Sequence, residues 1–168
     1  MPSWKYFKLT LKHKWFVLLA GRKIGVPFFR LLMHDWSKFL PSELPHYGRQ
    51  FFGDANRPYN FAVCWARHQN RHEHHWEYWV PRSGHTRGGY FDYEPIAMPE
   101  VAIREMVADW MGASRAYEGK WPDYQNWKWV KENLPKMHLH TGTVDQINDI
   151  VQQLRNRAVL SGEKGGCR

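Results

Sequence analysis

Residues 31–43, LLMHDWSKFLPSE, place a histidine and an aspartate side by side at the end of an apolar run. An ionised carboxylate in such surroundings needs a cation or several hydrogen bonds. One interpretation is a salt bridge to Asp35 from Lys38, on the next turn. The other is a metal ion that binds His34 and Asp35 together and leaves Lys38 free for a phosphate. The apolar pattern around this stretch also predicts the fold.

Helical patterns and helix-starting residues extend along nearly the whole chain. Pro27 can open a helix that continues through this stretch, and Pro99 with Glu100 can open another. In chain order, the predicted helices cover about residues 3–21 (or to 25), 27–39, 42–53, 61–79, 99–118, 121–137 and 143–160. There is no internal repeat and no clear strand pair. The sequence therefore predicts an all-α fold, a single-domain bundle of six or seven helices.

Two segments fall outside this helical pattern. Residues 81–98, PRSGHTRGGYFDYEPIAM, are rich in Gly, Pro and Arg, and we expect either a lid over a pocket or a surface loop there. Residues 161–168, SGEKGGCR, are expected to form a flexible tail. The helical domain is thus predicted to span residues 1–160.

The composition sets broad limits on function. A chain of 168 residues with 43% hydrophobic side chains can build one core. Its 24 Lys and Arg exceed its 16 Asp and Glu, and the formal charge of +8 fits either phosphorylated partners or simply a basic surface. Ten Trp, nine Phe and eight Tyr can fill a core or form walls for planar ligands.

The same sequence gives a weak indication of location. Its two cysteines cannot form a disulfide framework or a zinc knuckle, and this low count fits a reducing, cytoplasmic environment. The basic start contains an apolar run, residues 15–20, that is too short to span a bilayer. We interpret it as part of an amphipathic first helix and predict no membrane partner, with docking of this segment on a membrane surface as the less favoured alternative.

The densest chemical signal is RHQNRHEHHWEYW, residues 67–79. His68, His72 and His75 are spaced i, i+4 and i+7, so on a helix they share one face. Imidazoles on one face can converge on a metal ion, or on a phosphate if they are protonated. The alternative is a solvated, histidine-rich face. The zinc-protease motif H-E-x-x-H is excluded because Trp76 stands where the second histidine belongs. The residues predicted to point along a neighbouring basic stripe are Arg67, Arg71 and His74.

Three further candidates lie on other predicted helices. Asp109 has apolar neighbours in REMVADWMGA, and because aspartate is a poor helix former inside a helix, we expect it to have a specific partner. Glu105 lies one turn earlier on nearly the same side. His13 lies on the first helix, where taken alone it also fits a surface histidine.

In chain order these residues resemble the H…HD…H…D signature of the HD-domain metal-dependent phosphohydrolases. The stretch HDWSK is similar to the HD-x-x-K core of that superfamily. Across most of its length the chain also resembles a largely uncharacterised HD-like family found in phages and bacteria. The stretches that carry this second resemblance are HDWSKF, HQNRHEHHWEYW and MPEVAIREMVADWMGA.

The resemblance implies a helical fold with a metal centre between the helices. Mapped onto this chain, the core ligands would be His13, His34, Asp35 and Asp109. His68 and His72 match the extra histidines of superfamily members that hold two metals, and Asp35 would then bridge the ions. Members cleave phosphomonoesters, phosphodiesters or triphosphates, and some perform oxygenation.

The expected function is hydrolysis of a phosphate ester, with a nucleotide as the expected substrate. One or two divalent transition-metal ions (Mn, Fe, Co, Ni or Zn) would activate water for attack on phosphorus. His75 or Glu105 would protonate the leaving oxygen or relay a proton. The residues expected to neutralise phosphate charge are Lys38, Arg67, Arg71 and Arg104.

Three other functions stay open at this point. Tryptophans among basic residues could form a stacking surface for single-stranded nucleic acid, with binding that is sensitive to salt and indifferent to a chelator. The protein could also sequester a nucleotide signal without cleaving it. Finally, the same ligand set could serve a di-iron oxygenase, which iron content and oxygen consumption would reveal.

Overall fold

The structure, a computed structural model, describes residues 1–54, 58–81, 85–86, 89–90 and 94–160. Its α-helices are α1 (Pro2–Lys23), α2 (Phe28–Met33), α3 (Leu44–Phe52), α4 (Pro58–Gln69), α5 (Glu100–Ala113), α6 (Lys128–Asn133) and α7 (Thr141–Leu160). The shorter helical turns are η1 (Trp36–Phe39), η2 (Trp76–Trp79), the π-helical η3 (Ser114–Glu118), η4 (Tyr124–Asn126) and η5 (Leu134–Lys136). The predicted all-α bundle is confirmed.

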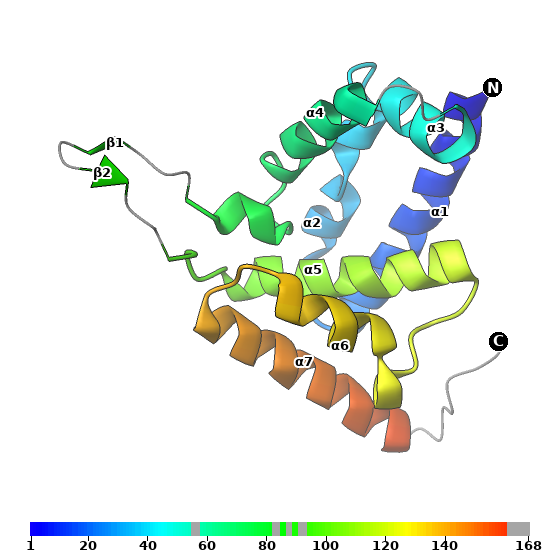
Figure 1. Cartoon of the computed structure of the whole chain (residues 1–168). Coiled ribbons are helices and arrows are strands. Elements are labelled where there is room, and N and C mark those ends of the chain that lie inside the picture. Colours follow the sequence, from blue (N-terminus) through cyan, green and yellow to red (C-terminus); the bar gives the residue numbers. More distant parts are fainter. Residues whose placement is uncertain (55–57, 82–84, 87–88, 91–93, 161–168) are drawn as a thin grey trace.

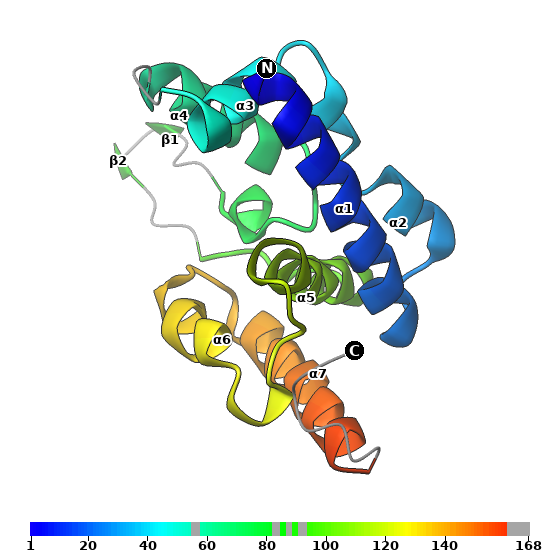
Figure 2. The ribbon, with the colours of Figure 1, turned by 90° about the vertical axis from the view of Figure 1, so that its right-hand side faces the viewer.

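Helix α5 runs through the middle of the molecule. In Figures 1 and 2, α1 to α4 lie on one side of it, and α6 and α7 lie on the other. Small and apolar residues on several sides of α5 are fully buried, so this helix contributes to the core in both directions. The buried core residues from α5 and its neighbours include Val17, Leu31, Ala102, Ile103, Met106, Val107, Val130, Ile147 and Leu154.

A very close helix contact in this core joins α1 and α5. A Cβ atom built on Gly112 would lie 2.5 Å from Val17 Cγ2 and 2.7 Å from the Val17 backbone nitrogen. Only glycine allows the two backbones to approach so closely. Since Val17 follows His13 by one turn and Gly112 follows Asp109 by about one turn, this contact also brings those two polar residues together.

The predicted helix over residues 27–39 is wrong in its middle. Helix α2 ends at Met33, and the chain passes through His34 and Asp35 before η1 begins at Trp36. Asp35 has φ 54° and ψ 22°, in the left-handed region that a continuous helix cannot contain. The histidine and the aspartate therefore lie in a break between two helical segments.

The predicted helix over residues 61–79 is also wrong in its second half. Helix α4 ends at Gln69, a turn follows, and only residues 76–79 form another helical segment. The Asn70 side chain donates a hydrogen bond of 2.6 Å to the Ala66 carbonyl oxygen, which is the type of local contact that competes with helix continuation. His72, His74 and His75 therefore do not follow the helical facing expected from their spacing.

Smaller differences occur elsewhere in the chain. The helix expected over 121–137 is divided into η4, α6 and η5. Within the 81–98 segment, β1 (His85–Thr86) pairs antiparallel with β2 (Gly89–Tyr90), a strand pair that the sequence did not indicate. The expected tail, residues 161–168, lies outside the described residues. In the described part of the chain, no helix is both long and apolar enough to cross a membrane.

Candidate metal centre

The break between α2 and η1 aims two consecutive side chains at one point. The left-handed conformation of Asp35 costs an L-residue about 1–2 kcal/mol, although aspartate adopts it more readily than most. The Lys14 ammonium stabilises this break by donating hydrogen bonds to the carbonyl oxygens of Leu32 and His34. Strained backbone of this kind is found mostly at functional sites.

A first group of possible ligands gathers on one oxygen of Asp35. His13 from α1 and Asp109 from α5 come from distant parts of the chain, and His13 Nε2 lies 2.9 Å from Asp109 Oδ1. His34 Nε2 lies 3.5 Å from both Asp35 Oδ2 and Asp109 Oδ1. The four residues expected as core ligands, His13, His34, Asp35 and Asp109, are therefore brought together, with their ligand atoms all within 4.8 Å of one another.

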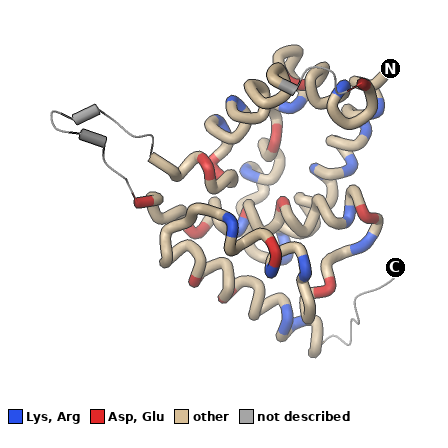
Figure 3. Tube along the Cα trace, in the orientation of Figure 1, with Lys and Arg blue, Asp and Glu red and all other residues tan. Residues whose placement is uncertain are grey.

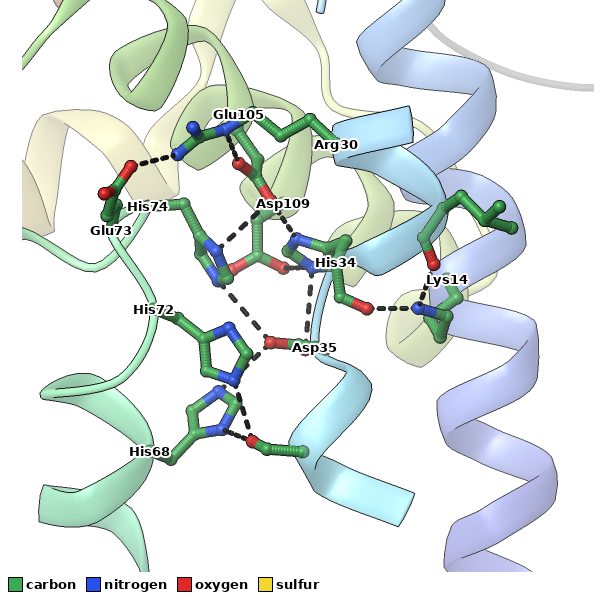
Figure 4. A network of polar contacts seen from close by, with 12 residues as sticks. Lys14, Arg30, His34, Asp35, His68, His72, Glu73, His74, Glu105 and Asp109 are labelled. Carbon is green, nitrogen blue, oxygen red and sulfur yellow. Dashed lines mark hydrogen bonds and ion pairs between the residues drawn. The ribbon is translucent and has the colours of Figure 1, made fainter. Parts of the chain in front are cut away.

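A second group gathers on the other oxygen of Asp35. His68 Nε2 lies 3.1 Å from Asp35 Oδ1, and His74 Nε2 lies 3.5 Å from the same atom. His75 completes this group within the same 4.8 Å limit. Figure 4 shows Asp35 in the middle of the network, with histidines approaching it from α2, from α4 and from the turn after α4.

These distances fit ligands arranged around metal ions. Ligand atoms bonded at about 2.1 Å to one ion lie roughly 3.0–3.4 Å apart in octahedral or tetrahedral geometry. Several of the inward-facing atoms are buried and make no well-oriented hydrogen bond among the described residues, although carboxylate oxygens lie close to some of them: Nε2 of His13, His34, His68, His74 and His75, and Oδ1 of Asp35. Burial of so many polar atoms without well-oriented hydrogen bonds is costly. A bound cation would satisfy all of them.

Carboxylates outside these two groups fix the orientation of three of the rings. Glu105 Oε1 lies 2.9 Å from His34 Nδ1 and 3.3 Å from His74 Nδ1. On the other side, Glu43 Oε2 lies 3.1 Å from His68 Nδ1. A carboxylate that accepts the Nδ1 proton leaves Nε2 free as a ligand, which is the usual arrangement around metal-binding histidines. Glu105 is thus placed to position these rings, and it also forms a third group of possible ligands with His34 and His74; its expected role in proton transfer stays a prediction.

The charges of the centre are strongly coupled. Burial alone would raise the pKa of the Asp35 carboxyl, but Lys38 and the neighbouring histidines hold it well below its usual range. Burial would lower the pKa of His34, but Asp35, Asp109 and Glu105 raise it to about 10. In the absence of a cation, His34 is thus protonated at neutral pH. A metal ion would take the place of that proton.

Lys38 forms a salt bridge with Asp35, which was one of the two interpretations of residues 31–43. Its Nζ lies 2.6 Å from Asp35 Oδ2, and only 7% of the residue is exposed. The Nζ also lies 5.6 Å from the centre of the Tyr47 ring, whose buried hydroxyl has no hydrogen-bond partner among the described residues. Lys38 is therefore not free, but it borders the same cavity as the ligands.

The placements of His72 and His74 are the reverse of those expected from the sequence. His72, expected as a ligand, is in neither group, and its Nε2 lies 2.7 Å from Ser37 Oγ. His74, expected to point elsewhere, belongs to the second group because α4 ends before it. Glu43 also contacts the site, through His68. Its sequence position gives no signal, since its partner His68 is 25 residues away.

The three arginines expected to bind phosphate are not among the described residues that line the cavity. The guanidinium group of Arg71 pairs with Glu43 at 2.6 Å. That of Arg104 binds Glu100 and donates a hydrogen bond to the Ile24 carbonyl oxygen. Arg67 is exposed near the end of α4. Of the four predicted phosphate-binding residues, only Lys38 faces the cavity.

A cavity of about 1060 Å³ borders the two groups of possible ligands. His13, His74, His75 and Asp109 form part of its wall, so both groups are accessible from it. The π-helical turn η3 directly follows α5 and places the Tyr117 ring in a stack on His13, with ring centres 5.8 Å apart. The other aromatic residues of the wall include Tyr47, Trp65, Trp76, Trp110, Trp121 and Trp129. The cavity thus combines a polar end with aromatic sides.

This arrangement defines a helical protein with a buried histidine–carboxylate centre that opens into an aromatic cavity. Residues 2–153 match the model of DUF5662, a family of unknown function, and the chain belongs to that family. No curated protein and no solved structure matches the chain significantly.

Proposed function

We propose that the chain is a metal-dependent phosphohydrolase that acts on a nucleotide or a related phosphate ester. The observation that carries the proposal is the position of Asp35, whose two carboxylate oxygens face two separate groups of buried possible ligands. Such a carboxylate can bridge two ions. The order of His13, His34-Asp35 and Asp109 in the chain, with the resemblance to the HD-domain phosphohydrolases, supports the same assignment.

The donor set fits divalent transition metals. Imidazoles and carboxylates together favour Mn, Fe, Co, Ni or Zn over Ca. When bound, such ions supply Lewis acidity that activates water and neutralises charge on phosphate oxygens. His13, His34, Asp35 and Asp109 would hold one ion. His68, His74 and His75, with the other Asp35 oxygen, would hold a second.

Other side chains of the cavity wall would contribute to substrate binding. Lys38 places a positive charge at the cavity wall beside Asp35, where it can attract a phosphate group. The unpaired Tyr47 hydroxyl, near Lys38, can donate a hydrogen bond to a phosphate oxygen. The aromatic wall can exclude water and stack on a planar base. These roles suit a substrate that carries both a phosphate and a base.

The proposal is tested by incubating the purified protein with Mn²⁺ and a panel of nucleotides, followed by product analysis. We expect release of phosphate or of a shortened nucleotide that stops when a chelator is added. Asp109→Asn should remove nearly all turnover, whereas the matched control Asp149→Asn, at an exposed position on α7, should retain it. If the metal-loaded protein binds nucleotides but leaves all of them intact, the hydrolase assignment is wrong and sequestration takes its place.

A further inference from the structure

The outer side of α1 and α2, away from the candidate metal centre, carries many exposed apolar side chains. On α1, Trp4, Leu11 and Trp15 are 57%, 48% and 58% exposed. At about 100° per residue these three lie on one stripe of the helix. Figure 2 shows α1 and α2 side by side. We call this surface the α1–α2 face, and its apolar residues are Trp4, Leu11, Trp15, Phe28, Phe29, Leu32 and Met33.

The chain segment that forms this face carries charged residues of one sign only, although Arg30 of α2 pairs with Glu73 and Glu105 from other elements. Residues 1–34 contain no Asp or Glu, whereas seven of them are Lys or Arg. Figure 3 shows Lys and Arg at several positions along α1. Lys8 and Arg22 lie on the same stripe as Trp4 and Trp15, and Lys8 Nζ is 5.3 Å from the centre of the Trp4 ring. The face therefore mixes bulky apolar groups with positive charge.

Three kinds of partner can be compared with this chemistry. A second copy of the chain would bring two positive surfaces together, which is unfavourable. Single-stranded nucleic acid could stack on the aromatic rings, but it would leave the aliphatic side chains of Leu32 and Met33 exposed to water. An anionic bilayer accommodates both features, because Trp, Phe and Leu enter the interfacial region while Lys and Arg bind lipid headgroups.

We propose that the α1–α2 face docks the protein on the surface of an anionic lipid bilayer. In this mode α1 lies in the plane of the interface and no helix crosses the membrane, so the absence of a spanning helix from the described residues does not argue against it. From the sequence, surface docking of the amphipathic first helix was the less favoured alternative to having no membrane partner. This docking proposal is independent of the hydrolase proposal, because none of the apolar residues of the α1–α2 face belongs to a group of possible ligands.

Vesicle co-sedimentation tests this proposal with the full chain. We expect the protein to sediment with vesicles of equal parts phosphatidylcholine and phosphatidylserine, and not with phosphatidylcholine alone. The double variant Trp15→Ser/Phe29→Ser should bind at least roughly tenfold more weakly. Lys8→Glu/Arg22→Glu should weaken binding to a similar degree. The matched control is Tyr59→Ser/Leu160→Ser, which alters residues that are 78% and 87% exposed on other helices, and it should bind normally.

Circular dichroism of each variant checks that the fold is kept. We expect it to be kept because all the substituted positions are exposed. No sedimentation with anionic vesicles would overturn the proposal, and so would equal binding by Trp15→Ser/Phe29→Ser. It is also overturned if that variant loses only oligonucleotide binding or only self-association. Metal content should be unchanged in all these variants, so failure here leaves the hydrolase proposal untouched.

Discussion

At Asp35 the backbone enters the left-handed region within a break between two helical segments, and its buried carboxylate faces a ligand group with each oxygen. The bridging role of Asp35 was implied only by the resemblance to HD-domain enzymes, and it stays a prediction. The sequence did not predict the backbone conformation, which depends on contacts such as the Lys14 hydrogen bond to the His34 carbonyl oxygen. Contacts between residues 20 positions apart leave no local pattern.

His72 and His74 lie in the same turn, and their different contacts offer a matched pair of variants. His74→Ala should lower the number of metal ions bound per chain, because His74 Nε2 faces Asp35 Oδ1. His72→Ala should leave that number unchanged, because His72 contacts Ser37 instead. Elemental analysis after dialysis gives both values. Equal metal loss in the two variants would show that the second group is assigned incorrectly.

Glu105 offers a test of ligand positioning without removal of any ligand. In Glu105→Gln the side chain keeps its size but loses the charge that holds Nδ1 of His34 and His74. Loss of such an outer carboxylate typically weakens metal binding by about 10–100-fold. The control is Glu100→Gln, an exposed residue on the same helix that pairs with Arg104. Titration with Mn²⁺ measures both affinities, and an unchanged affinity in Glu105→Gln would exclude the positioning role.

At the scale of elements, helix existence was easier to predict than helix ends. The start of α5 after Pro99 and the end of α3 before Gly53 follow from local residue preferences, and both agree with the sequence. The end of α4 at Gln69 has no Gly or Pro signal. It depends on the Asn70 side chain and on the contact between His74 and Glu105 of α5. The histidine spacing therefore suggested a single helical face that does not exist.

The close contact of α1 with α5 links helix packing to the candidate metal centre. Gly112→Ala would place a methyl group 2.7 Å from the Val17 backbone, so the helices must move apart, at a cost of about 1–3 kcal/mol. The same movement separates His13 from Asp109. We expect a lower melting temperature, measured by circular dichroism, together with weaker metal binding. Gly142→Ala is the control, because its methyl group would meet only the His140 ring, at 3.3 Å. A Gly112→Ala variant as stable as the parent would contradict the packing described here.

At the scale of the whole molecule, the coupled histidines predict how stability depends on pH without metal. Burial lowers the pKa of His13, His72 and His75, which are neutral in the folded state, so stability rises with pH up to about 6.5, the usual histidine pKa. The pKa of His34 is raised to about 10, so the stability it contributes is lost as pH rises from about 6.5 to 10.

Melting temperatures measured in a chelator between pH 5 and pH 10 check this pattern, with a maximum expected near neutrality. With Mn²⁺ present, the ion must displace the His34 proton, so the increase in melting temperature caused by the metal should grow as pH rises. A melting temperature that stays constant above pH 7 in the chelator would contradict the protonated state of His34.

We have proposed that Asp35 lies between two bound metal ions. The most direct measurement is anomalous X-ray diffraction from crystals grown with Mn²⁺, combined with elemental analysis of the same protein. We predict two anomalous peaks, one between Asp35 and the His13–Asp109 pair and one between Asp35 and the His68–His74 pair. If metal-loaded crystals show no peak at either position, Asp35 does not lie in a metal centre.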